Sequence, residues 1–327
     1  MNFDHYIAVD WSMTTMAIAR MTTVAERIKI TEHPTSVKDL KVYLKSLKGT
    51  KVLTFEESNN SQWLYVELKD WVDKILVCDP SRNHLLNDGP KNDKIDAEKL
   101  VRLLRGDFLK EVFHTSDKII YMRKLVSHYQ DVVRMGVMVK NQRSAMYRSY
   151  GLNHKRDTFY GDDAIEEFVV KHQDTQIVSY ENSKKEYEAK FKETVKQFPA
   201  AKLLKSIPGI GDIHAVELLA IIVDVKRFPS LGHLYSYAGL IRHEKFSGGR
   251  YYGNRKPRYS RELKRVIKMA TFSALAGNSE NKLAKYYRYL LEKGVAGHNA
   301  RHAVSRKILA YVYGILKSER ILDSTKF

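Results

Sequence analysis

Cysteine and long apolar runs are scarce in this sequence. It contains one cysteine, Cys78, in 327 residues, which excludes an intrachain disulfide and fits a reducing cytoplasm. Cys78 ends the apolar run ILVC, so we expect it to be a small core residue. The start MNFDHYIAVD lacks the basic segment and apolar core of a signal peptide. The longest strongly apolar stretch, residues 218–223, is far too short to cross a bilayer, so we expect a cytoplasmic protein.

Acidic residues are in the minority. The chain has 38 Asp and Glu against 56 Lys and Arg, which gives a net charge of +18. Such an excess indicates a polyanionic partner, most often nucleic acid. An anionic membrane surface is the alternative, but no long basic amphipathic helix ends the chain and neither end carries a lipidation motif, so we expect no membrane partner. Apolar residues make up 43% of the sequence, which indicates a globular protein.

Residues 1–115 alternate between strand and helix patterns. Three strands, at 5–12, 16–21 and 27–33, precede a helix at 37–47. Strands at 51–58 and 74–80 follow, with a helix between them and another after a Gly-Pro turn. This order predicts an α/β fold in which helices cover a mixed sheet, and it resembles an RNase H-like domain.

The rest of the chain is expected to be mainly helical. Residues 116–200 contain two long polar helix patterns, which we interpret as an antiparallel hairpin or an intermolecular coiled coil. Residues 201–327 combine further helices with a Gly-rich basic loop. We therefore predict three domains, at 1–115, 116–200 and 201–327.

Acidic side chains occur where apolar strands end. Asp10 follows the run IAV, and Glu56 occupies the matching position in VLTFEES. Asp93 and Asp96 lie three residues apart at a helix start, so both can face one cation. Four carboxylates at one edge of a sheet would repel one another, and divalent cations would relieve that repulsion. Oxygen-only ligands favour magnesium, with manganese as the alternative.

Other interpretations of these acidic residues stay open. Asp93 can cap its helix, with Asp96 in the place that Glu takes in a capping box. Asp10 can be an ordinary residue of a turn at the end of a strand. Glu57 can replace Glu56 as the ligand, because neighbouring residues of a strand point in opposite directions.

A Gly-rich, basic segment contains a serine that precedes two glycines, Ser247 in EKFSGGR. Its cations suit phosphate contacts that position a duplex without reading its sequence. Tyr251, Tyr252 and Tyr259 can stack on sugars or unpaired bases. A solvated loop with an ordinary serine is the alternative. The residues expected to contact nucleic acid here are Arg242, Lys245, Arg250, Arg255, Lys256 and Arg258.

Two short motifs follow the same logic. SIPGIGDIHA places Gly209 and Gly211 between helix patterns, as in a helix-hairpin-helix whose backbone N–H groups hold a DNA phosphate; a simple turn is the alternative. The string HNAR at 298–301, followed by Tyr311 and Tyr313, is similar to the His-x-x-Arg of tyrosine recombinases. Its spacing is too short for that family, so we expect a helix that packs its apolar face.

Taken in chain order, these motifs resemble a known family. IAVDWS, VLTFEES, VCDP and KNDKIDAEKL, together with SIPGIGDIHAVELLAIIVDVKRFPS, LYSYAGLIRHEKFSGG and AVSRKILAYVYGILK, resemble the DEDD transposases of the insertion-sequence-110 group, which include the pilin-gene invertases. The resemblance covers nearly the whole chain apart from the middle helices. It implies a RuvC-like first domain whose tetrad binds magnesium through Asp10, Glu56, Asp93 and Asp96. The family commonly has Asn where this chain has Asp79, which either adds a fifth carboxylate or only forms a turn.

The resemblance also implies the reaction and the partners. Ser247 matches a serine that acts as the nucleophile on DNA, in a mainly helical C-terminal transposase domain. We therefore expect a recombinase that cuts and rejoins double-stranded donor and target DNA under the direction of a bridge (guide) RNA. A homo-oligomer, from dimer to tetramer, and a place at the bacterial or archaeal nucleoid are implied as well. Downstream of Gly249 the sequence YYGNRKPRYSREL departs from the family's Thr-Lys-x-Gly-Asn run.

Several alternatives to this function stay open. The chain can be a RuvC-like, structure-specific nuclease of the Holliday-junction resolvase kind, without covalent serine chemistry. It can be a site-specific DNA invertase, or a nucleic-acid-binding remnant without catalysis. The sequence also leaves open whether the tetrad and the serine act within one chain or across two subunits.

Overall fold

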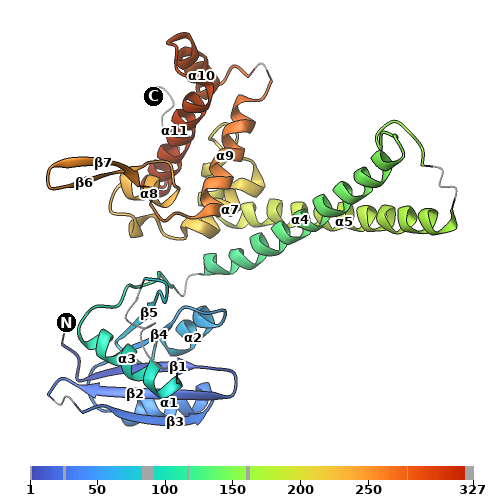
Figure 1. Ribbon diagram of the computed structural model, residues 1–327. Coiled ribbons are helices and arrows are strands. Elements are labelled where there is room, and N and C mark those ends of the chain that lie inside the picture. The colour runs from blue at the N-terminus through green and yellow to red at the C-terminus, as the bar shows by residue number, and fades with distance from the viewer. Residues whose placement is uncertain are drawn as a thin grey trace. The chain divides into compact units, whose positions relative to one another are not determined.

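A computed structural model describes residues 2–24, 27–82, 92–115, 118–159, 163–255, 257–277 and 279–320. The chain divides into two compact units, Met1–Asp117 and Lys118–Phe327 (Figure 1). Contacts group the helices expected at 116–200 with the following segment. The three-domain division therefore stays a prediction.

The first unit is built on a five-stranded mixed sheet. Its strands are β1 (His5–Trp11), β2 (Thr15–Thr22), β3 (Lys29–Pro34), β4 (Lys51–Glu56) and β5 (Lys74–Cys78). Their spatial order is β3-β2-β1-β4-β5. The pairs β1–β2 and β2–β3 are antiparallel, whereas β1–β4 and β4–β5 are parallel. The predicted mixed sheet with its RNase H-like strand order is confirmed.

Alternation along the strands gives the sheet two apolar faces. Tyr6 and Ala8 of β1 belong to a core cluster with α3 (Asp93–Arg105). Ile7 and Val9 point the other way, into a cluster with α1 (Val37–Ser46) and α2 (Ser61–Leu68). Cys78 is fully buried, as its apolar neighbours predict. Because successive side chains of β1 and β4 point to opposite faces of the sheet, the position of a residue in the strand decides which helices its side chain contacts.

Two long helices open the second unit. After the short η2 (Lys118–Tyr121), α4 (Met122–Ser149) and α5 (Ala164–Gln197) pack against each other as a hairpin (Figure 1). A Cβ on Gly136 of α4 would lie 2.3 Å from the Tyr180 ring of α5, so a glycine is needed where the helices approach. The helical hairpin is present, and its use as a coiled coil between subunits stays a prediction.

The remaining elements are two exposed strands and helices that pack around one apolar core. They are α6 (Pro199–Leu204), α7 (Asp212–Ile222), η3 (Val225–Arg227), α8 (Leu231–Tyr237), β6 (His243–Ser247), β7 (Arg250–Arg255), α9 (Arg261–Leu275), α10 (Lys282–Glu292) and α11 (Gly297–Ser318). The core contains one face of α4 and α5 together with α7, α9 and α11. A mainly helical C-terminal region is confirmed. Among the described helices, none is long and apolar enough to span a membrane.

Candidate metal centre and nucleic-acid interface

Asp10 and Glu56 reach the same edge of the sheet. Ala8 of β1 pairs with Thr54 of β4 in parallel register, and the two carboxylates stand two residues further along their strands. Because residues two apart point to one face, both side chains lie on the face that α3 covers. The predicted meeting of strand-end carboxylates therefore follows from the register.

Helix α3 carries the other two carboxylates to that face. Its buried residues are Ala97, Leu100, Val101 and Leu104. Asp93 and Asp96 lie one turn before Ala97 and Leu100, so they continue the buried stripe beyond the end of the core. The Thr15 hydroxyl of β2 donates to Asp93 at 3.4 Å, and Asp96 pairs with Lys99 at 3.8 Å.

Asn92, and not Asp93, caps this helix. The Asn92 side chain accepts a hydrogen bond from the Lys94 backbone N–H at 2.9 Å. The capping interpretation of Asp93 is therefore wrong, because Asn92 already supplies the N-cap. The carboxylates of Asp93 and Asp96 still benefit from the helix dipole in the first turn. The Gly-Pro turn expected before this helix lies outside the described residues.

The four carboxylates share one electrostatic environment. The pKa of Asp10 is raised to about 6, first by burial and then by three neighbouring carboxylates. In order of their effect, these neighbours are Asp93, Glu56 and Asp96. Repulsion of this kind is what a bound cation relieves, and an all-oxygen donor set suits magnesium.

The carboxylates do not form a closed ligand shell in this arrangement. Within the described ranges, no three or more His, Cys, Asp or Glu side chains are close enough together to hold one metal ion. The donor chemistry and the repulsion at Asp10 fit a divalent cation, whereas coordination requires the four side chains to converge further. The tetrad's role as a metal site therefore stays a prediction.

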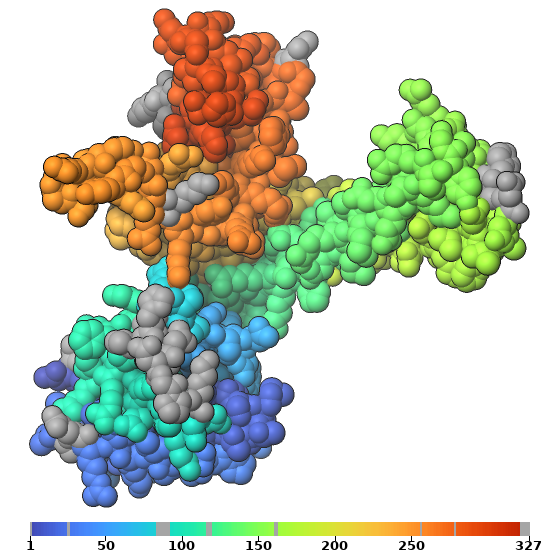
Figure 2. Space-filling model, viewed as in Figure 1, coloured from blue at the N-terminus to red at the C-terminus, as the bar shows by residue number. Residues whose placement is uncertain are grey.

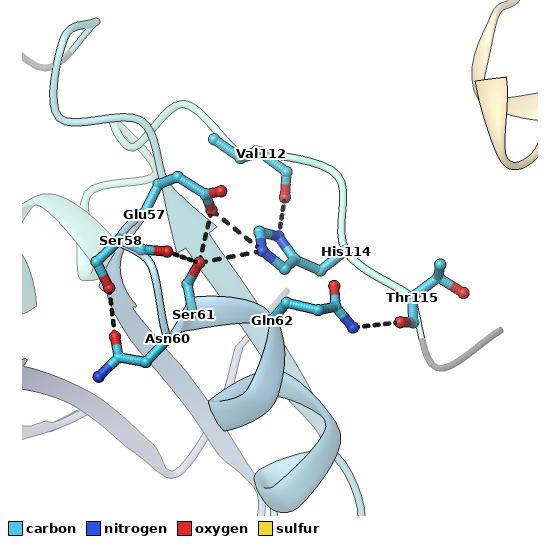
Figure 3. A network of polar contacts seen from close by, with 8 residues as sticks. All are labelled: Glu57, Ser58, Asn60, Ser61, Gln62, Val112, His114 and Thr115. Atoms are coloured by element: carbon cyan, nitrogen blue, oxygen red, sulfur yellow. Dashed lines mark hydrogen bonds and ion pairs between the residues drawn. The ribbon is translucent and has the colours of Figure 1, made fainter. Parts of the chain in front are cut away.

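Glu57 takes part in a different network, shown in Figure 3. Its carboxylate accepts a hydrogen bond from Ser61 at 3.1 Å and lies 3.1 Å from His114 Nε2. His114 Nδ1 contacts the Val112 carbonyl at 3.0 Å. A catalytic triad would use the two ring nitrogens for Ser and acid separately, whereas here Nε2 faces both. The network braces the end of β4 against residues 112–115 and engages Glu57 away from Asp10, which favours Glu56 as the tetrad member.

Asp79 is engaged locally as well. Its carboxylate accepts hydrogen bonds from the backbone and hydroxyl of Ser81 at 3.0 and 2.6 Å. It also pairs with Arg82 at 3.0 Å. Asp79 is not among the groups that raise the pKa of Asp10. These contacts support the turn interpretation over a fifth carboxylate at the site.

Ser247 lies at the tip of a β-hairpin that projects from the second unit (Figures 1 and 2). It pairs with Arg250 across a two-residue turn, Gly248 and Gly249, whose φ angles are 54° and 75°. Glycines permit this left-handed turn, which matches the twist of the paired strands. Ser247 is exposed, and its hydroxyl makes no hydrogen bond within the described part of the chain. The segment expected to be a basic loop is therefore a β-hairpin. The Gly-Gly dipeptide in the sequence already indicates the tight turn of this hairpin.

The residues predicted to contact phosphates lie on this hairpin and on the segments that flank it. Arg242, Lys245, Arg250, Arg255 and Arg258 are all exposed. Lys256 lies outside the described residues. Their arrangement along one projecting ribbon fits a strand of nucleic acid better than a compact anion.

The tyrosines of the segment divide into two groups. Tyr251 and Tyr252 are 55% and 63% exposed, so both can stack on a nucleic acid. Tyr259 is different, because a Cβ on Gly239 would lie 2.6 Å from its ring. One side of the half-buried Tyr259 ring packs against Gly239, so stacking of this ring on nucleic acid stays a prediction.

Gly209 and Gly211 have different environments. Gly209 has φ +88°, and a Cβ there would lie 2.1 Å from the Ala270 carbonyl of α9. Gly211 is the N-cap of α7 and faces open space. Lys205 pairs at 2.6 Å with Asp212 in the first turn of α7. Gly209 thus has a packing role, whereas Gly211 leaves the helix start open for a phosphate.

Two family models of transposases match this chain. A DEDD transposase model of the IS110 group, described as "Transposase", matches residues 7–151. A second model, described as "Transposase IS116/IS110/IS902 family", matches residues 201–288. The two matches occur in chain order and together include the strand-end carboxylates, α3, and the segment from α6 to the hairpin.

Curated relatives agree with these family models. An insertion element IS110 protein of 43.6 kDa from Streptomyces coelicolor is 26% identical over 48% of this chain and 39% of its own length. An insertion element IS116 protein of 44.8 kDa from Streptomyces clavuligerus is 24% identical over 45% of this chain and 36% of its own length. The pilin gene-inverting protein of Moraxella lacunata is 30% identical over 38% of both chains. The chain thus spans about two fifths of the length of these relatives.

These matches agree with the motif order, the mixed sheet and the helical second unit. A DEDD domain implies a divalent metal, in keeping with the four carboxylates at the ends of β1 and β4 and at the start of α3. The chain belongs to the IS110/IS116/IS902 family of transposases and carries that family's DEDD domain at its N-terminal end.

Proposed function

We propose that this protein is a DNA transposase that cuts and rejoins DNA strands by phosphoryl transfer. Family membership supports the reaction class. The relative named a pilin gene-inverting protein supports inversion as one outcome of the same chemistry. The single observation that carries the proposal is the register that sets Asp10 and Glu56 at one level of the sheet, on the face where α3 presents Asp93 and Asp96.

In this proposal Asp10, Glu56, Asp93 and Asp96 hold magnesium, with manganese as a substitute. Two such ions, when bound, stabilise the attacking and leaving oxygens of a phosphodiester. The chain's own contribution is positioning: parallel register sets Asp10 and Glu56 at one level, and α3 supplies the opposite wall. The Glu57–His114 network keeps the end of β4 fixed while the carboxylates converge.

Ser247 is the proposed nucleophile. Its Oγ forms a bond to phosphorus while the bond from phosphorus to one deoxyribose oxygen breaks, and the serine proton ends on that oxygen. Attack by a second strand's hydroxyl then reverses the exchange and frees Ser247. The number of phosphoester bonds is conserved, so no external energy source is needed. Exposure of Ser247 at a projecting tip supports its access to a DNA strand.

The partners are proposed as double-stranded donor and target DNA and a bridge RNA. The net charge of +18 and the basic hairpin support contacts with both nucleic acids. Base pairing by the RNA would supply sequence specificity, while the protein contacts backbones. A dimer or tetramer joined through the α4–α5 hairpin would bring several chains to the exchanged strands.

Denaturing electrophoresis tests the proposal. The protein is incubated with candidate DNA, copurified RNA and magnesium, and a DNA band bonded to protein is expected. The band should disappear for Ser247→Ala and for Asp10→Asn. It should persist for Ser273→Ala, which alters an exposed serine elsewhere in the same unit. An adduct that survives in Ser247→Ala would exclude this serine as the nucleophile.

A structure-specific nuclease is the second candidate. It is favoured by one observation: the Ser247 hydroxyl has no hydrogen-bonded base within the described part of its unit. In that case Ser247→Ala would cut branched DNA as fast as the parent protein, and no protein–DNA bond would form at all.

A further inference from the structure

A basic cavity lies between α9 and α11, away from the hairpin tip. Its volume is about 270 Å³, and Leu240 closes one side. Helix α9 contributes Lys264 and Lys268, one turn apart. This volume is slightly below the usual range for small-molecule pockets, so it suits a phosphate with its sugar better than a large cofactor.

The start of α11 supplies the facing wall. His298, Arg301 and His302 line the cavity, and they include two residues of the HNAR string. The helix begins without a capping side chain and without an acidic residue in its first turn. Its positive end therefore adds to the charge of the side chains and is not offset locally.

Among the residues that the structure describes, no carboxylate lines this cavity. In the described ranges, Lys264, Lys268 and Arg301 form no ion pair with an acidic residue. The pKa of His302 is lowered, first by burial and then by nearby cations, of which Lys264 has the largest effect. Cations gathered without acidic partners repel one another, and a bound anion removes that repulsion.

The lysines are held at the rim by aromatic rings. Lys264 lies over Tyr259 with its ammonium 4.5 Å from the ring centre, and Lys268 lies 5.6 Å from the centre of Phe272. The floor is polar, because the hydroxyls of Thr271 and Ser305 lie 2.8 Å apart. Each is also bonded to a carbonyl of its own helix, so the charged walls are left to hold a ligand.

The cavity adjoins the root of the basic hairpin. Leu240 lines it three residues before β6 begins, and the charge of Arg242 contributes to the lowered pKa of His302. A strand anchored here would pass directly onto the cations of β6 and β7. This continuity favours a polymer of phosphates over an isolated small anion.

We propose that the α9–α11 cavity is a phosphate pocket that holds one phosphate of a DNA strand, with Lys268 and Arg301 as its principal contacts. The proposal rests on the proposed function, because it assumes a DNA partner. The pocket would hold the DNA strand at a fixed point of the protein, between the helical core and the basic hairpin. The bound phosphate is either within the backbone or at a strand end.

Salt-dependent binding to labelled DNA tests the pocket. Fluorescence anisotropy with a duplex is compared for the parent protein, Lys268→Gln, Arg301→Gln and the double variant. Each single change should weaken binding about tenfold, the loss expected for one hydrogen bond to a charged group. Because both cations hold one phosphate, the double variant should be little weaker. In the double variant, the negative slope of log affinity against log salt concentration should become smaller in magnitude by about 0.9, which corresponds to the loss of one phosphate contact.

The matched control is Lys192→Gln with Lys196→Gln, an exposed pair on α5 that removes the same charge. This control should bind DNA as the parent does. Two results would overturn the pocket and indicate a diffuse basic surface. One is a loss of DNA affinity in Lys268→Gln/Arg301→Gln that equals the sum of the losses, in free energy, of the two single variants. The other is a loss of DNA affinity in the control that is as large as in the pocket variants. Duplexes with and without a 5′-phosphate separate a terminal from a backbone phosphate, and either result supports the pocket.

Inorganic phosphate provides an independent arm. Inorganic phosphate is added to the parent and to the double variant, and the thermal stability of each is measured. Suppose that phosphate stabilises the parent but not the double variant, and that both bind DNA equally well. The pocket then binds free phosphate, and its assignment to a DNA strand is wrong. Parent-like DNA binding by the pocket variants overturns this inference while leaving the transposase proposal intact. Loss of the covalent band in Ser247→Ala is a separate result, so failure of one proposal is distinguished from failure of the other.

Discussion

Asp10 and Glu56 lie at the same level of two adjacent parallel strands, each two residues beyond the paired Ala8 and Thr54. Parallel pairing gives both side chains the same face, and α3 completes the site from above that face. The site therefore depends on one register, which brings the carboxylates close enough to repel one another.

Magnesium should stabilise the first unit. Binding to the folded state alone, at a concentration about 100 times Kd, adds about 2.7 kcal/mol to the free energy of unfolding. Thermal unfolding with and without magnesium measures this, and Asp10→Asn should lose the gain. The exposed change Asp70→Asn is the control and should retain it. Equal stabilisation of the Asp10 variant by magnesium would count against the site.

Without metal, Asp10 should make stability depend on pH. Its pKa is raised to about 6, above the ordinary 3.8, so the folded state keeps this proton more readily than the unfolded chain. The Asp10 contribution to the free energy of unfolding should therefore fall as pH rises from about 4 to about 6. Urea unfolding of the parent and Asp10→Asn should converge below pH 4, and the variant should be the more stable at pH 7. Parallel curves across the range would contradict the shift.

The ion pair between Arg265 and Glu217 should stabilise the fold of the second unit. Glu217 is 1% exposed and accepts hydrogen bonds from Arg265 at 2.5 Å and from Gln130 at 3.2 Å. Arg265→Ala would leave a buried carboxylate without its cation, at a cost of about 3 kcal/mol in the free energy of unfolding. Arg288→Ala removes an exposed ion pair with Glu280 and should cost less than about 1 kcal/mol. Chemical denaturation of both variants compares the two sites.

The two glycines of SIPGIG should respond differently to alanine. Gly209→Ala should destabilise the protein by about 2 kcal/mol or more, because the backbone has φ +88° and the methyl group would meet the Ala270 carbonyl. Gly211→Ala has room for its methyl group and should change stability by less than about 1 kcal/mol. Thermal unfolding measures both. A Gly211 variant that folds normally but binds DNA more weakly would support a phosphate at the start of α7.

Mixing inactive chains should show whether the two catalytic groups come from one subunit. Asp10→Asn lacks the tetrad but keeps Ser247, and Ser247→Ala has the reverse defect. If the groups act across subunits, mixed oligomers should form the protein–DNA band that neither variant forms alone. If they act within one chain, the mixture should stay inactive. The assay is the same denaturing gel, after the two variants are denatured and refolded together.

Much of the first unit follows from sequence alone, since the alternation of strands and the positions of Asp10 and Glu56 at strand ends are local properties. The order of strand and helix then predicts the mixed sheet, and the three-residue spacing of Asp93 and Asp96 predicts a shared helix face. The Gly-Gly dipeptide also predicts a tight turn, although the segment around it is a β-hairpin and not the expected loop.

Tertiary structure decided the choices that depend on contacts between distant residues. The bond from Ser61 to Glu57 and the pairing with His114 separate Glu57 from Glu56, and Asn92 takes the capping role from Asp93. The approach of α9 to α11 gathers Lys268 and Arg301 at one cavity, a placement that no local pattern contains. Sequence determines which residues can face a helix or strand partner, whereas packing decides which partner each one meets.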